Sequence, residues 1–192
     1  MTLHSLAQKS IAAAAFGLGL AALTAPALAA DWTVDKDKSR LGFTVKQADG
    51  EVVGQFDAWS ADIDFDPAAP EKAVIKASIE TGSVVTGNRQ YDDMLQQPDY
   101  FSISAFPAAT FETTQVIPLG EDAYKAEGTL AIKGVSQPVV LDFTLKIDGD
   151  TAKAEGTATV QRLAYGMGTS VATGTLEDTV TVTLDLTATR AQ

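Results

Sequence analysis

The sequence has 192 residues, with 14 Lys and Arg against 25 Asp and Glu, a formal net charge of −11, and no Cys. Its single His is His4, so the chain beyond the N-terminus has neither an imidazole nor a thiol. These absences exclude Ser-His-Asp and Cys-His catalysis, disulfides, and the usual donors for zinc, haem, iron–sulfur and type-1 copper sites. We therefore expect no metal and no other cofactor.

The N-terminal segment has the pattern of a secretory signal peptide. Lys9 supplies a positive charge, residues 11–23 are apolar, and Ala27-Leu28-Ala29 is a small-residue cleavage site. We expect cleavage after Ala29, which leaves residues 30–192 as one exported domain. No later segment reaches the roughly 20 apolar residues of a spanning helix. The absence of Cys excludes a lipid-modified cysteine anchor, so the predicted location is the periplasm.

Removal of residues 1–29 also removes Lys9, which leaves 13 Lys and Arg against 25 Asp and Glu and a formal charge of −12. A surface of this sign repels phosphate backbones and anionic headgroups. We therefore expect no nucleic acid partner and no charge-driven adhesion to membranes.

Apolar and polar residues alternate along much of the remaining chain, the pattern of half-buried strands. The alternation is clearest in "KAVIKASIE" (72–80), "PVVLDFTLKID" (138–148) and "DTVTVTLDLTA" (178–188). Weaker strands are predicted near 32–47, 51–66, 109–118, 122–133 and 151–164. The chain thus reads as an all-β domain of eight strands, and eight antiparallel strands close into an up-and-down barrel or fold as a sandwich.

The inner face of two strands is unusually small. Residues 152, 154, 156 and 158 are Ala, Ala, Gly and Ala, and residues 126 and 128 are Ala and Gly. Voids are costly, so a retained void indicates a binding cavity. The alternative is that large partners, Phe56, Phe65, Phe111 and Phe143, reach across and fill the space. Periodicity alone leaves both interpretations open.

The segment "SVVTGNRQYDDMLQQPDYF" (83–101) predicts a short helix among the strands. Tyr91, Met94 and Leu95 share one helical face, Asn88 suits the N-cap, and Pro98 ends the helix. Asp92 and Asp93 favour the first turn through the helix dipole. With Tyr100, Phe101 and Phe106 following, the segment is interpreted as a lid at an opening of the barrel.

Several short motifs follow one another in order along the chain: "VDKDKSRLGFTV" (34–45), "VVGQF" (52–56), "SVVTG" (83–87), "PDYF" (98–101), Phe106-Pro107, Thr110-Phe111, "GTLAIKGVSQPVVL" (128–141), and Arg162 with Gly166. Together they resemble the YceI-like family of bacterial periplasmic proteins that bind lipids or polyisoprenoids. The resemblance implies an elongated eight-stranded antiparallel barrel, similar to lipocalins, with the apolar tail of an amphiphile inside.

The chain departs from the family pattern at two places. The family often has a His where this chain has Gln47, and Arg-Asp-x-His-Leu where this chain has residues 91–95, Tyr-Asp-Asp-Met-Leu. Arg89 either replaces the missing cation or is solvated.

We predict that the ligand is an isoprenoid or fatty-chain lipid, such as a polyisoprenoid, a quinone or a fatty amide, held without catalysis. The loops at 46–50, 83–101 and 162–172 are expected to meet its polar end. The sequence does not decide whether the protein forms a homodimer. The predicted ligand-binding residues are the inward apolar positions, the lid residues and two residues of the last long loop: Phe43, Val45, Phe56, Ile63, Phe65, Ile75, Ile79, Met94, Leu95, Phe101, Phe106, Phe111, Ala126, Leu130, Phe143, Ala154, Ala158, Arg162 and Tyr165.

Two other functions remain as alternatives. A filled barrel would be an interaction module that serves a membrane redox or stress-response partner. A hydrolase would need paired carboxylates, for example Asp92 and Asp93 with Glu112 or Glu127. Because most acidic residues alternate outward on strands, solvation explains them and a carrier is the preferred interpretation.

Overall fold

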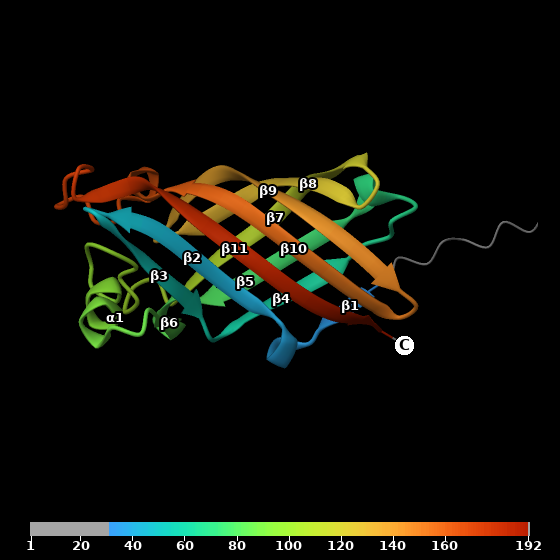
Figure 1. Ribbon diagram of the computed structural model, residues 1–192, viewed down its shortest axis with the longest axis horizontal. Coiled ribbons are helices and arrows are strands. Elements are labelled where there is room, and N and C mark those ends of the chain that lie inside the picture. The colour runs from blue at the N-terminus through green and yellow to red at the C-terminus, as the bar shows by residue number, and fades with distance from the viewer. Residues whose placement is uncertain (1–30, 192) are drawn as a thin grey trace, which may run out of the picture.

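The computed structural model describes residues 31–191, which form one antiparallel sheet and a short helix at one end (Figure 1). The predicted signal peptide, residues 1–29, lies outside the described residues. The strands are β1 Asp31–Val34, β2 Arg40–Gln47, β3 Gly50–Phe56, β4 Trp59–Asp64, β5 Val74–Glu80, β6 Val84–Val85, β7 Ala108–Gly120, β8 Ala123–Ile132, β9 Val135–Asp148, β10 Thr151–Gln161 and β11 Leu176–Arg190. The helix α1 is Arg89–Leu95, and 3-10 turns occupy Lys36–Lys38, Pro70–Lys72, Thr81–Ser83 and Arg162–Tyr165.

The sheet closes on itself because the first strand pairs with the last. Trp32, Thr33 and Val34 of β1 lie opposite Arg190, Thr189 and Ala188 of β11. From β1 the ring runs through β4, β5, β7, β8, β9, β10 and β11, and every neighbouring pair is antiparallel. This confirms the predicted eight-stranded antiparallel barrel with one short helix.

Three further strands extend this ring toward α1. β2 follows β1 along the chain and pairs with β11, β3 pairs with β2, and the two-residue β6 pairs with β3. The barrel is elongated, with α1 and β6 near one end and the C-terminus at the other (Figure 1). We call these the α1 end and the far end.

Two predicted strands are interrupted. The strand expected at 32–47 is divided into β1 and β2 by a 3-10 turn, and the strand expected at 51–66 is divided into β3 and β4. At the first break the backbone N–H of Asp35 donates to the carbonyl of Thr187, so the turn stays attached to β11. Each broken strand therefore still follows one path around the barrel.

Two phenylalanine rings of the inner face lie over glycines of the neighbouring strand: Phe43 over Gly54 and Phe111 over Gly128. A side chain at Gly128 would place its Cβ 2.6 Å from both the Phe111 ring and the Glu112 carbonyl oxygen. The rings thus pack against the barrel wall, and the small residues make room for them. This arrangement accounts for part of the small inner face without filling the centre.

We predict that Gly128→Ala destabilises the barrel by about 1–3 kcal/mol, because the new methyl group meets a backbone oxygen that cannot move aside. Gly50→Ala is the matched control, since its nearest neighbour would be the Gln47 carbonyl at 3.8 Å. Urea unfolding of both variants gives the comparison. Equal stability of the two variants would contradict the packing of Phe111 over Gly128.

Candidate functional site

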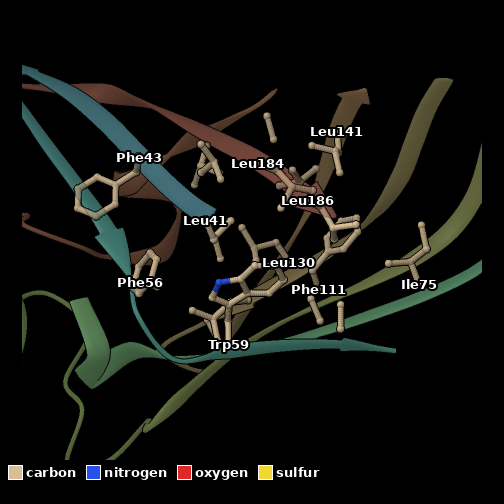
Figure 2. A pocket seen from close by; sticks show the side chains of 18 of the residues that line it. Leu41, Phe43, Phe56, Trp59, Ile75, Phe111, Leu130, Leu141, Leu184 and Leu186 are labelled. Atoms are coloured by element: carbon tan, nitrogen blue, oxygen red, sulfur yellow. The ribbon is translucent and has the colours of Figure 1, made fainter. Parts of the chain in front are cut away.

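A cavity of about 290 Å³ lies inside the barrel. Its lining reaches from Trp32 and Phe65 near the far end to Leu95 and Met167 near the α1 end. Figure 2 shows Phe43 and Phe56 toward one end of this space and Ile75 toward the other, with Trp59, Phe111 and Leu130 between them. The lining side chains are apolar apart from Arg162, so the space suits a hydrocarbon rather than a polar solute.

The volume decides between the two interpretations of the inner face. A filled interior leaves few voids larger than a water molecule, whereas an engineered apolar cavity of roughly 150 Å³ already stays dry and binds benzene. The cavity here is larger, and Phe56, Phe65, Phe111 and Phe143 line it without meeting at its centre. The filled barrel on which the interaction-module alternative depends is therefore not present.

The far end is closed by aromatic packing. The indole N–H of Trp32 donates to the carbonyl of Phe65 at 2.9 Å, and the Arg190 guanidinium lies 4.7 Å from the centroid of the indole ring. The Phe65 ring meets Tyr124 edge-on, and Tyr124 stacks on Phe143. Such aromatic pairs contribute about 0.5–1.5 kcal/mol each beyond their buried area. This end is part of the core.

The helix α1 forms one part of the wall at the α1 end. Asn88 caps it by accepting a hydrogen bond from the Gln90 backbone N–H, as the sequence predicted. Asp92 accepts from both the backbone and the side chain of Thr86 at 2.7 Å, which fixes the segment that leads into the helix. Leu95 then points at the cavity, and Phe101 follows it in the lining. The predicted lid therefore does lie at this end of the barrel.

The buried Arg162 holds the loop that faces α1. Arg162 is only 4% exposed. Its guanidinium donates hydrogen bonds, at distances of up to 3.1 Å, to the backbone carbonyls of five residues: Met167, Gly168, Val171, Leu176 and Glu177. A guanidinium has five N–H donors, so none is left for a ligand. Although Arg162 was predicted to meet the polar end of the ligand, its donors fasten loop 166–177.

Asp99 connects this loop to the lid segment. Its carboxylate accepts from Ser170 Oγ at 2.6 Å and from Thr169 Oγ1 at 3.1 Å, and its carbonyl accepts from the Gly168 N–H. The hydrogen bond from the Ser170 hydroxyl, with a smaller contribution from the Thr169 hydroxyl, holds the pKa of the Asp99 carboxyl below its ordinary value. The two segments that cover the α1 end are thus fastened to each other.

The structure places most of the predicted ligand-binding residues in the cavity wall: Phe43, Val45, Phe56, Ile63, Phe65, Ile75, Ile79, Leu95, Phe101, Phe111, Leu130, Phe143, Ala154, Ala158 and Arg162. The wall also contains Leu41, Trp59, Leu141, Leu184 and Leu186, which the prediction omitted. The signal for Leu41 was present in the sequence, because it shares the alternation of Phe43 and Val45.

The other predicted residues lie outside the wall. Met94 packs with Val45 and Tyr100 beside it, and Phe106 is 37% exposed with its ring over Gly134. Ala126 is fully buried in the far-end core. Tyr165 is 2% exposed, its hydroxyl has no hydrogen-bond partner among residues 31–191, and burial raises its pKa.

The two departures from the family pattern contact each other. The Tyr91 hydroxyl donates to Gln47 Oε1 at 3.0 Å and so joins α1 to the end of β2. A hydrogen bond between two uncharged side chains therefore joins these two positions at the α1 end. Arg89 lies on the outside, with its side chain 94% exposed and 3.8 Å from the Asp93 carboxylate.

The carboxylates of the hydrolase alternative are used elsewhere. Asp92 holds Thr86, Glu112 forms an ion pair with Lys76 at 2.9 Å, and Glu127 accepts from Gln115 at 2.9 Å. Glu112 and Glu127 follow the cavity-lining Phe111 and the buried Ala126 along β7 and β8, so they point to the outer face of the barrel. The structure does not bring these groups together around a cleft.

Residues 31–191 contain no group of three or more acidic or other ligating side chains that could hold a metal ion. Within the same range, no helix is both long enough and apolar enough to cross a membrane.

The fold and the cavity define the chain as a closed antiparallel barrel that encloses an apolar space. The model of the YceI-like domain matches residues 32–188, and the chain belongs to the YceI-like family. It is 33% identical over 164 residues to the UPF0312 protein PA0423 of Pseudomonas aeruginosa, covering 80% of this chain and 85% of the relative.

Two solved structures are similar to this one. BcnA of Burkholderia cenocepacia is 29% identical with a TM-score of 0.77, and the match covers 81% of this chain and 99% of BcnA. A polyisoprenoid binding domain of Saccharophagus degradans has a TM-score of 0.64 over 83% of this chain and 98% of that domain. At 15% identity the second likeness concerns the fold alone.

We predict that Arg162→Gln lowers the free energy of unfolding by about 2–4 kcal/mol, because several buried carbonyls lose a charged donor at once. Thermal or urea unfolding measures the loss. Arg89→Gln is the control, because its exposed side chain makes one long ion pair. An Arg162→Gln variant as stable as the control would contradict the role of Arg162 in holding the loop.

We predict that Asp99→Asn loosens the contact between the lid segment and loop 166–177. The folded pKa of Asp99 is lowered, so its contribution to stability is present above the ordinary pKa of a carboxyl and is lost as the pH falls through the folded value. Amide hydrogen exchange near residues 168–171 should therefore be faster in the variant at neutral pH, and the two proteins should converge in acid. Asp93→Asn is the control, and exchange in this loop that is equal in the wild type and Asp99→Asn at neutral pH would contradict the contact.

Proposed function

We propose that this chain is a non-catalytic carrier for an amphiphile with a long apolar chain, and that the chain of the ligand lies in the barrel cavity. The observation that carries the proposal is the enclosed apolar space of about 290 Å³. The polyisoprenoid binding described for the Saccharophagus degradans domain supports a prenyl tail as one candidate. Quinones and fatty amides present the same hydrocarbon surface.

Burial of the tail supplies the driving force. Each methylene removed from water contributes about 0.8 kcal/mol, so a chain of a dozen carbons gains roughly 10 kcal/mol before the costs of association. Those costs are at least about 4 kcal/mol, which leaves at most about 6 kcal/mol and a dissociation constant of tens of micromolar, so micromolar affinity needs a longer chain. No polar contact is needed for this affinity, in agreement with the apolar lining.

The size of the cavity sets a condition on the ligand. Small-molecule pockets are usually about 300–1,000 Å³, so this space takes a thin, extended chain. A longer ligand requires side chains at the α1 end to move, and Met167, in the lining there, is an adaptable residue.

We place this activity in the periplasm. The N-terminal pattern at residues 1–29 supports export, and the absence of Cys suits a domain whose stability comes from packing alone.

The first experiment extracts the purified protein with organic solvent and analyses the extract by mass spectrometry. We expect a co-purified lipid, and saturable binding of long-chain probes after its removal. Finding neither a lipid nor saturable binding would overturn the proposed function.

Two buried alanines provide a matched pair of variants. Both belong to the far-end core, but Ala154 also lines the cavity whereas the fully buried Ala126 does not. We predict that Ala154→Phe folds and loses lipid binding, while Ala126→Phe is destabilised by about 1–3 kcal/mol or more through overpacking. Unfolding curves and lipid content measure the two effects, and an Ala154→Phe variant that unfolds like Ala126→Phe would contradict an empty cavity.

A further inference from the structure

A second pocket, of about 180 Å³, lies where the barrel wall is interrupted. The paired register of β2 and β3 ends at Leu41 and Phe56, and that of β1 and β4 begins at Trp32 and Ile63. Between these points the two paths have no backbone ladder to each other. We call this interruption the seam.

The hydrogen bonds on either side of the seam point away from it. The N–H of Asp35 donates to Thr187 on β11, whereas the N–H of Asp57 donates to the Ser83 carbonyl on the opposite side. Each edge is therefore held by its outer neighbour, and side chains alone cover the interruption. The side chains of Phe56 and Trp59 line both the seam pocket and the central cavity. Figure 2 shows both residues beside the central space.

The lining of the seam pocket is mostly polar, and its residues carry a net positive charge. Its lining includes the cations Lys36 and Arg40 and one acid, Asp57, a sum of +1 in a chain of strongly negative charge. The Asp57 carboxylate already accepts from Gln55 at 2.8 Å.

Among residues 31–191, neither Lys36 nor Arg40 forms an ion pair; the ion pairs found there join Lys38 to Asp35, Lys76 to Glu112, Arg89 to Asp93, and Arg190 to Asp150. Asp185 lies across the strand pair from Arg40 without reaching ion-pair distance. Two cations that line one pocket without carboxylate partners favour an anionic group.

The two ends of the barrel are covered by fastened loops and core residues, whereas the seam has no backbone ladder across it. At the α1 end, Arg162 and Asp99 fasten the covering loops, and at the far end Trp32 and Phe65 belong to the core. At the seam, Phe56 and Trp59 are the residues that line both spaces, and both are half-buried. Side-chain rotation in partly exposed residues is fast compared with loop opening.

We propose that the seam pocket binds the anionic head, a phosphate or carboxylate, of an amphiphile whose tail passes between Phe56 and Trp59 into the central cavity. The inference rests on the proposed function, because it assigns the head of the same ligand. Lys36 and Arg40 donate to the head, and the aromatic pair contacts the first carbons of the tail.

The experiment compares three probes on the lipid-free protein: farnesyl phosphate, farnesol and inorganic phosphate. Farnesol measures the binding of the tail alone, and inorganic phosphate measures that of a free anion. We expect the wild type to prefer farnesyl phosphate to farnesol by about 5- to 30-fold, since two exposed cations each add a modest charge-assisted contact. Inorganic phosphate should compete poorly.

The double variant Lys36→Gln/Arg40→Gln should bind the two prenyl probes about equally, with its farnesol affinity unchanged. The matched control is Lys146→Gln/Lys153→Gln, which removes the same charge from exposed positions that face each other on β9 and β10. It should keep the preference, because the pocket and not the overall field of the protein determines it.

Several outcomes would overturn the inference. A preference for farnesyl phosphate that survives in Lys36→Gln/Arg40→Gln, or that is absent from the wild type, places the head elsewhere. Competition by inorganic phosphate at similar concentrations, or undiminished binding of farnesyl phosphate to Ala154→Phe, indicates a site for free anions. Failure of farnesol to bind the wild type, together with no lipid in the extract, is the separate result that removes the proposed function itself.

Discussion

The closed ring of backbone hydrogen bonds is the constraint on which the rest of the structure depends. Once β1 pairs with β11, the diameter of the barrel is fixed by the strand number and stagger, and no strand can move inward to collapse onto a void. The inward side chains must then share a set volume. Because the rings of Phe43 and Phe111 lie over glycines, they occupy the wall and leave space along the axis. The cavity is thus a product of backbone closure and of where the glycines fall.

The same constraint explains why polar groups are confined to the edges of the cavity. A ladder satisfies every backbone group it contains, so unsatisfied carbonyls remain only where strands stop. Arg162 meets five of them in loop 166–177, and Asp99 meets the hydroxyls next to it. At the seam, by contrast, the polar groups are the exposed side chains of Lys36, Arg40 and Asp57. The wall is therefore apolar in its middle, and polar side chains gather at three places: around Arg162, around Asp99 and at the seam.

Much of this arrangement could be predicted from the sequence, because alternation in segments such as 138–148 and 178–188 states which residues face inward. The strand count, the helix with its Asn88 cap and most of the wall residues follow from such local patterns. The breaks between β1 and β2 and between β3 and β4 did not follow, because a 3-10 turn of three residues at the first and a bend of two residues at the second barely disturb the alternation around them. The structural role of Arg162 could not be predicted, because its carbonyl partners are contributed by a loop whose path no periodicity describes.

Pairing of the first strand with the last also governs when the barrel can form. The residues of β11 opposite β1 are 188–190, so before these residues are synthesised the opening strand can pair with β4 alone. Until then the apolar inner face lacks its final cover, and contacts between such distant residues form slowly. A truncation of only a few C-terminal residues would leave β1 without its ladder to β11 and expose an unpaired edge that invites aggregation. The integrity of this domain is therefore decided at its C-terminus.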